Sequence, residues 1–193
     1  MGAQPELRIG RRPDKGEGDR METDTMIDAL RASGPHPDLA DRLMIFGQFV
    51  GAWEVDITNY GPDGTATRVP GEWHFGWALE GRAVMDVWIA PRRSLRGATE
   101  SGEYGVTVRI FEPAIDAWRS TWIGPARGAV KPFIARQVGD EIVLDGRFGA
   151  DRLERWIFSD IAPTGFRWRY VASDDGGSTW TTVQEMAARR ASA

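Results

Sequence analysis

Hydrophobic and polar residues alternate with a period of two along most of the chain after residue 51. In GAWEVDITNY, the apolar Trp53, Val55 and Ile57 alternate with polar side chains, and similar segments recur as far as residue 190. Turn sequences rich in Gly and Pro separate nearly every pair of segments. This spacing predicts about ten short antiparallel strands in an up-and-down meander. Because closure removes the exposed edges of such a meander, we expect an all-β barrel.

The first fifty residues follow a different pattern. Residues 1–37 are rich in Gly, Pro, Asp, Glu and Arg and have few large apolar groups, so we expect a flexible N-terminal arm. Leu39, Leu43 and Phe46 then recur at helical spacing, which predicts a short amphipathic helix over residues 38–48. The predicted barrel domain therefore covers residues 38–190.

A short motif, Gly51-x-Trp53, stands where the predicted helix changes to the first strand. It resembles the GxW opening of lipocalins and related calycin barrels, in which the Trp plugs one end of the barrel. The resemblance implies that a late Arg, here Arg189 or Arg190, packs over the Trp53 ring through a cation–π contact. Residues 42–190 also resemble uncharacterised calycin-like proteins of the DUF1579 type, on the segments FVGAWEVDI, LEGRAVMDVWI, AIDAWRSTWI and SDDGGSTW.

A second motif lies between the last two predicted strands. Ser173-x-Asp175-x-Gly177-x-Thr179-Trp180 matches the Asp-box pattern. In that hairpin turn, the Asp and Ser or Thr side chains bond backbone amides and the Trp packs beneath. Because the turn recurs on unrelated folds, we interpret it as structural and not catalytic.

Composition excludes several classes of chemistry. The chain of 193 residues has no Cys, two His and a net charge of −4. The absence of Cys excludes disulfides and thiolate chemistry, and the weak negative charge offers no field for nucleic acid or an anionic membrane. There is no apolar run of about 18 residues and no secretory signal pattern, so we expect a cytoplasmic protein. We also expect no metal and no cofactor.

Nine Trp residues are many for a chain of this length. A lipocalin-like barrel can enclose one small ligand, and indole rings suit a cavity for an apolar or aromatic molecule. The alternative is that the rings only fill the interior. The candidate ligand-binding residues are Arg119 and the strand tryptophans Trp73, Trp77, Trp88, Trp118, Trp122, Trp156 and Trp168.

Four strand residues are candidates for acid/base chemistry inside the barrel: His74, Asp86, Arg109 and Glu185. Histidine is a residue type suited to general acid/base chemistry, and a buried carboxylate would have a raised pKa or an Arg partner. Each also fits a solvent-facing or structural position. As a haem ligand, His74 would make the chain similar to nitrobindins, but their proximal His lies near the C-terminal end, where this chain has none.

The direction of Arg109 depends on which face of its strand is buried. If Val106 and Val108 face outward, Arg109 points into the barrel, where it binds a ligand carboxylate or enolate or pairs with Asp86 or Glu185. The plainer alternation places the valines inside and Arg109 outside.

Three functional hypotheses follow. The first is a barrel that binds a small hydrophobic or aromatic molecule. The second is a cofactor-free enzyme on the same barrel, such as a cyclase, isomerase or hydratase of bacterial secondary metabolism, by analogy with similar barrels. The third is an interaction protein that forms a homodimer through its edge or rim. None of them involves nucleic acid or a membrane.

Overall fold

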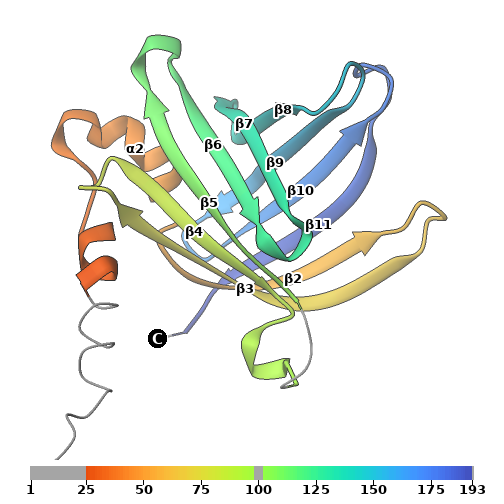
Figure 1. Cartoon of the computed structure of the whole chain (residues 1–193), viewed down its shortest axis with the longest axis horizontal. Coiled ribbons are helices and arrows are strands. Elements are labelled where there is room, and N and C mark those ends of the chain that lie inside the picture. The colour runs from red at the N-terminus through yellow and green to blue at the C-terminus, as the bar shows by residue number, and fades with distance from the viewer. Residues whose placement is uncertain (1–24, 98–101, 193) are drawn as a thin grey trace, which may run out of the picture. The chain divides into compact units, whose positions relative to one another are not determined.

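The computed structural model describes residues 25–97 and 102–192 (Figure 1). Residues 1–24 of the predicted arm lie outside this range, and residues 25–30 are helical. From Arg31 onward the chain forms the barrel unit. Its first strand, β1 (Arg31–Ala32), pairs with Ala78 and Trp77, so the last part of the predicted arm is ordered. Strand pairing uses backbone groups, which a polar composition does not reveal.

Ten antiparallel strands close into a barrel within the described residues, which confirms the predicted fold class. The strands β2 to β11 are neighbours in sequence order, and β11 pairs with β2 to complete the circle. Their bounds are β2 (Gly51–Tyr60), β3 (Ala66–Ala78), β4 (Ala83–Ala90), β5 (Glu103–Glu112), β6 (Ala117–Gly124), β7 (Ala129–Val138), β8 (Glu141–Arg147), β9 (Leu153–Ala162), β10 (Gly165–Ser173) and β11 (Thr181–Arg190).

A short helix closes one end of the barrel. The α2 helix (Ala40–Gly47) follows a 3-10 turn at Pro37–Leu39 and lies at the end of the barrel away from the turn between β2 and β3 (Figure 1). Its Leu43 and Phe46 are fully buried, and the Phe46 ring centroid lies 4.9 Å from that of Trp118. The helix therefore seals this end with an aromatic core.

The GxW motif forms the plug that the lipocalin resemblance implied. The Arg190 guanidinium lies 4.1 Å from the centroid of the buried Trp53 ring. It also donates hydrogen bonds to the carbonyls of Pro163, Val50 and Gln48, at 2.8, 3.0 and 3.3 Å. Gly51 has a φ of +131°, and a Cβ there would lie 2.6 Å from Arg190 Nη1. The contact between Arg190 and the Trp53 ring therefore requires glycine at position 51 as well as tryptophan at position 53.

Candidate functional site

Alternate residues of each strand face the barrel interior, and β5 shows which ones. Thr107 and Arg109 are each 1 % exposed, whereas Tyr104 and Ile110 are 46 % and 43 % exposed. The valines of β5 share the outer face with Tyr104 and Ile110. Arg109 consequently points inward, as the first of the two predicted arrangements requires.

Arg109 pairs with Asp86 inside the barrel. The carboxylate of Asp86 contacts the guanidinium of Arg109, and both side chains are almost fully buried. Asp86 also accepts hydrogen bonds from Trp73 Nε1 at 2.7 Å and Thr107 Oγ1 at 3.3 Å. The guanidinium lies 4.9 Å from the centroid of the Phe46 ring. The pair separates the aromatic closed end from the rest of the interior, and Arg109 Nε is buried without a hydrogen-bond partner among the described residues.

Beyond the pair, the interior contains a cavity of about 160 Å³. Its lining comes from eight of the ten strands within the described residues, so the cavity lies inside the barrel. Trp73 and Thr107, which bond Asp86, lie at its base. Five tryptophans surround it, and we call them the tryptophan belt: Trp73, Trp88, Trp122, Trp156 and Trp168.

The belt is a continuous chain of ring contacts. Ring centroids are 6.3 Å apart for Trp73 and Trp168, 5.4 Å for Trp168 and Trp156, and 6.3 Å for Trp156 and Trp122. Trp122 lies 6.0 Å from Trp88, which is the cross-strand partner of Trp73. Interplanar angles of 64° to 86° give edge-to-face contacts, the arrangement that aromatic rings favour. The belt therefore encircles a rigid aromatic space.

Two buried indole N–H groups of the belt have no hydrogen-bond partner in the part of the chain that the structure describes. The Nε1 atoms of Trp156 and Trp168 are buried and make no hydrogen bond within the described residues. By contrast, Trp73 Nε1 donates to Asp86 and Trp88 Nε1 donates to Met186 Sδ at 3.2 Å. Because a buried unpaired donor is costly, these two groups are suited to an acceptor atom of a ligand.

Two ion pairs lie beside the cavity, one at its wall and one at its mouth. Lys131 Nζ lies 2.8 and 2.7 Å from the two carboxylate oxygens of Glu154, whose side chain is 5 % exposed. Arg127 pairs with Glu103 at 2.8 Å, and its own side chain is 79 % exposed. The Arg127–Glu103 pair therefore marks the mouth, while Lys131 reaches the interior.

Tyr170 adds a neutral polar group to the wall. Burial, with a further contribution from the Glu154 charge, raises the pKa of its phenol to about 12. Arg152 Nη2 lies 3.3 Å from the phenol oxygen and donates to it. At neutral pH the Tyr170 hydroxyl is therefore protonated and lies between the side chains of Arg152 and Glu154.

Three predicted site residues lie outside the barrel. His74 contacts Glu72 at 3.0 Å on the outer face of β3, and Arg119 pairs with Glu112. Glu185 accepts a hydrogen bond of 2.6 Å from Tyr60 and is exposed. Strand alternation thus divides the four acid/base candidates between two faces of the sheet: His74 and Glu185 face outward, and the inward Asp86 and Arg109 are paired with each other.

Two predicted tryptophans do not line the cavity. Trp118 packs on Phe46 at the closed end. The Trp77 ring lies so close to the helix that a Cβ on Gly47 would come within 2.4 Å of it. Both rings therefore hold the helix against the barrel.

Sequence reasoning missed Lys131 as a cavity residue because GPARGAVKP resembles a loop. In the structure, a 3-10 turn at Pro125–Arg127 leads directly into β7, and Lys131 is its third residue. The buried Phe133 and Ala135 continue the same inward face. Extending this alternation back across Pro132 was the signal that could have placed Lys131 inside.

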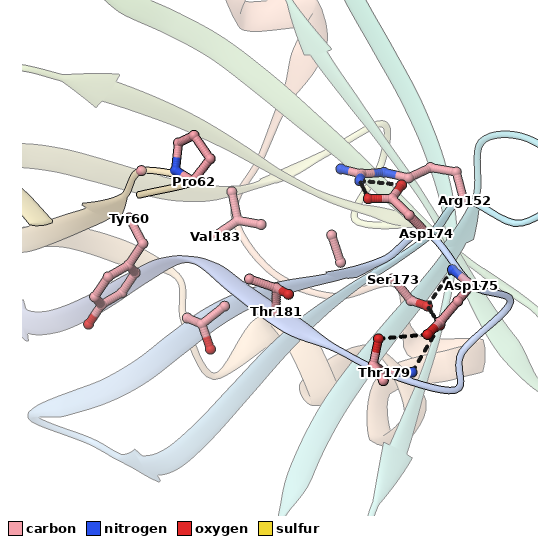
Figure 2. Close-up of a pocket in the computed structure, with 12 residues that line it drawn as sticks. Tyr60, Pro62, Arg152, Ser173, Asp174, Asp175, Thr179, Thr181 and Val183 are labelled. Carbon is pink, nitrogen blue, oxygen red and sulfur yellow. Dashed lines mark hydrogen bonds and ion pairs between the residues drawn. The ribbon is translucent and has the colours of Figure 1, made fainter. Parts of the chain in front are cut away.

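A larger hollow of about 440 Å³ lies beside the β10–β11 turn (Figure 2). Asp175 accepts hydrogen bonds from the Thr179 backbone at 2.9 Å, the Thr179 hydroxyl at 2.6 Å and the Ser173 hydroxyl at 2.7 Å, which lower its pKa. Arg152 pairs with Asp174 at 2.7 Å. The structure confirms the Asp-box turn, and its charged groups already have partners.

In residues 25–97 and 102–192, no three His, Asp or Glu side chains gather as a metal site. The helices in that part of the chain are too short or too polar to cross a bilayer.

Comparison with solved structures places this fold among known barrels. Rv2717c from M. tuberculosis aligns with a TM-score of 0.53 at 10% identity, over 82% of this chain and 99% of that one. The S-type phycobiliprotein lyase CPES from Guillardia theta aligns with a TM-score of 0.51 at 11% identity, over 78% and 92%. Such identities show the fold alone, which is lipocalin- or calycin-like.

No protein-family model and no curated protein matches the sequence. The finer resemblance to DUF1579-type proteins stays a prediction.

Proposed function

We propose that the barrel binds a small aromatic molecule that carries a hydrogen-bond acceptor. The observation that carries the proposal is the tryptophan belt around an interior cavity, with two buried N–H donors that no described residue accepts from. Rigid indole rings offer a large contact area to a flat apolar ligand. The ligand's acceptor would take the free hydrogen bonds of Trp156 and Trp168.

The cavity volume sets the size of this ligand. An apolar cavity of about 150 Å³ in another protein holds benzene. The belt encloses about 160 Å³, which suits one aromatic ring with a small substituent. Longer substituents would have to extend past Arg127 at the mouth, where its exposed side chain meets solvent.

Two probes of matched shape test the proposal. Acetophenone has one ring and a carbonyl acceptor, and α-methylstyrene replaces that carbonyl oxygen with a methylene group. Quenching of tryptophan fluorescence should show saturable binding of both probes. Acetophenone should bind about 5–10-fold more tightly, because one net hydrogen bond contributes about 1 kcal/mol. If neither probe causes saturable quenching, the proposed ligand class is rejected.

Replacing one tryptophan by phenylalanine tests the contribution of the indole N–H separately from that of the aromatic ring. Trp168→Phe keeps an aromatic wall but removes the N–H, so the preference for acetophenone should shrink toward equal binding. Trp180→Phe is the matched control, because Trp180 Nε1 already donates to the Gly177 carbonyl at 3.1 Å. An unchanged preference in Trp168→Phe would show that the carbonyl lies elsewhere.

A further inference from the structure

The outer face of β4, β5, β6 and β7 is mostly apolar, although it faces away from the core, and the Arg119–Glu112 pair is one of its few charged features. These strands lie side by side in Figure 1 (green). One row across them joins the outward-facing Val87, Val106, Ile123 and Val130 as successive cross-strand partners. We call this row and its neighbour, described next, the apolar wall. The exposed fractions of Val130 and Ile123 are 65 % and 38 %.

The neighbouring row has the same character. Met85, Val108, Thr121 and Pro132 are successive cross-strand partners on these four strands. The two rows together contain no ionisable side chain. The exposed Tyr104 on the same face of β5 extends the wall.

The opposite outer wall shows what a solvated face of this barrel looks like. There Arg169 and Glu185 are cross-strand partners on β10 and β11, and Arg189 pairs with Asp56 at 2.9 Å. The outside of a barrel in water normally carries such polar residues at alternate positions. One wall follows this rule and the other does not, and an exposed apolar patch of this kind is typical of an interaction surface.

The geometry points to a second copy of this chain as that partner, in a homodimer formed through the apolar wall. Four strands about 4.8 Å apart and about nine residues long present roughly 600 Å² of face. This face already includes Tyr104 and Ile110, and two such faces would bury about 1,200 Å² in total, the lower end of the range for stable interfaces. A wall without charge offers nothing to select a charged foreign protein, whereas its apolar chemistry is complementary to itself. This inference is independent of the cavity ligand.

Substitution at the wall tests the dimer. The wild-type chain should sediment at about twice 21.4 kDa in analytical ultracentrifugation at micromolar concentration. Val130→Glu puts a charge on each copy in the interface and should raise the dimer dissociation constant at least about 10-fold. Val171→Glu on β10 makes the same change outside the apolar wall and should leave the dimer intact.

Each outcome is decisive. A dimer that Val130→Glu dissociates and Val171→Glu preserves supports the inference, provided that thermal unfolding of both variants stays cooperative. A wild-type mass of 21.4 kDa at 100 μM would overturn it, because another segment or partner would then have to cover the wall. A dimer that survives both substitutions would also overturn it, since the interface would lie elsewhere.

Discussion

Asp86 and Arg109 form an ion pair between the neighbouring strands β4 and β5, with side chains that are 0 % and 1 % exposed. The pair lies between the helix-capped end of the barrel and the tryptophan belt. Asp86 also holds Trp73, so the carboxylate fixes one ring of the belt in place. The most deeply buried charges of the barrel therefore support the cavity, while no acid/base group of the pair is free to act on a ligand.

Breaking this pair should destabilise the protein strongly. Asp86→Asn leaves the Arg109 charge buried without a counter-charge, so the free energy of unfolding should fall by about 3–5 kcal/mol. Urea denaturation measures the change. Glu112→Gln is the control, because its pair with Arg119 lies on the outside of the barrel, partly exposed, and should contribute less than about 1 kcal/mol. Equal losses in the two variants would contradict the structural role of Asp86.

Because Arg190 covers the Trp53 ring and Arg189 does not, we expect substitutions of these adjacent arginines to have different effects on stability. Arg190→Met removes the cation–π contact and three hydrogen bonds to carbonyls, and should lower the free energy of unfolding by about 1–2 kcal/mol. Arg189→Met removes only the exposed pair with Asp56 and should cost about 0.5 kcal/mol or less. Thermal or urea unfolding measures both losses of stability. A larger loss in Arg189→Met than in Arg190→Met would contradict the role of Arg190 in the plug.

Glu72 should make stability depend on pH in the acid range. Hydrogen bonds from Arg93 lower the pKa of its carboxyl from 4.5 to about 2. A carboxyl with a lowered pKa in the folded state stabilises fully above its ordinary pKa and loses this contribution as pH falls. The stability difference between wild type and Glu72→Gln should thus be constant above about pH 5 and shrink between pH 4.5 and 2. Urea denaturation at several pH values tests this, and a difference that does not change with pH would exclude the ionic contribution.

Removing the negative charge of Glu154 should increase the affinity of the cavity for an anionic ligand. In Glu154→Gln, the Lys131 ammonium loses its counter-charge beside the cavity. Affinity for benzoate should then rise by about 10-fold relative to that for neutral benzamide, since the freed cation attracts the carboxylate. Titration of both probes into wild type and variant measures the ratio. An unchanged ratio would place the Lys131 ammonium out of reach of the ligand.

Much of the fold follows from the sequence pattern because the strand period is short and repeated. Alternation around Trp53 and the turn chemistry around Asp175 each depend on residues close in sequence. Arg190 could be matched to Trp53 only through the family resemblance, because no local rule links residues 137 positions apart. Barrel closure likewise followed from the cost of exposed edges.

The site was less predictable because alternation gives two faces without saying which one lies inside. Trp73 and His74 occupy opposite faces of one strand, and only the packing of Trp73 into the barrel shows that His74 is outside. On β5 the apolar face is the outer one, the reverse of the usual pattern. That reversal depends on the Asp86–Arg109 pair and on what covers the outer wall, neither of which a single strand encodes.

The belt's indole N–H signals give the most direct measurement of ligand binding. In a ¹H–¹⁵N spectrum, the Nε1–H resonances of Trp156 and Trp168 should shift in a saturable way when acetophenone is added. Those of Trp53 and Trp180 should stay in place, because these groups already donate to the carbonyls of Phe49 and Gly177. If the resonances of Trp156 and Trp168 do not move while the probe is at millimolar concentration, the barrel does not bind aromatic acceptors in its tryptophan belt.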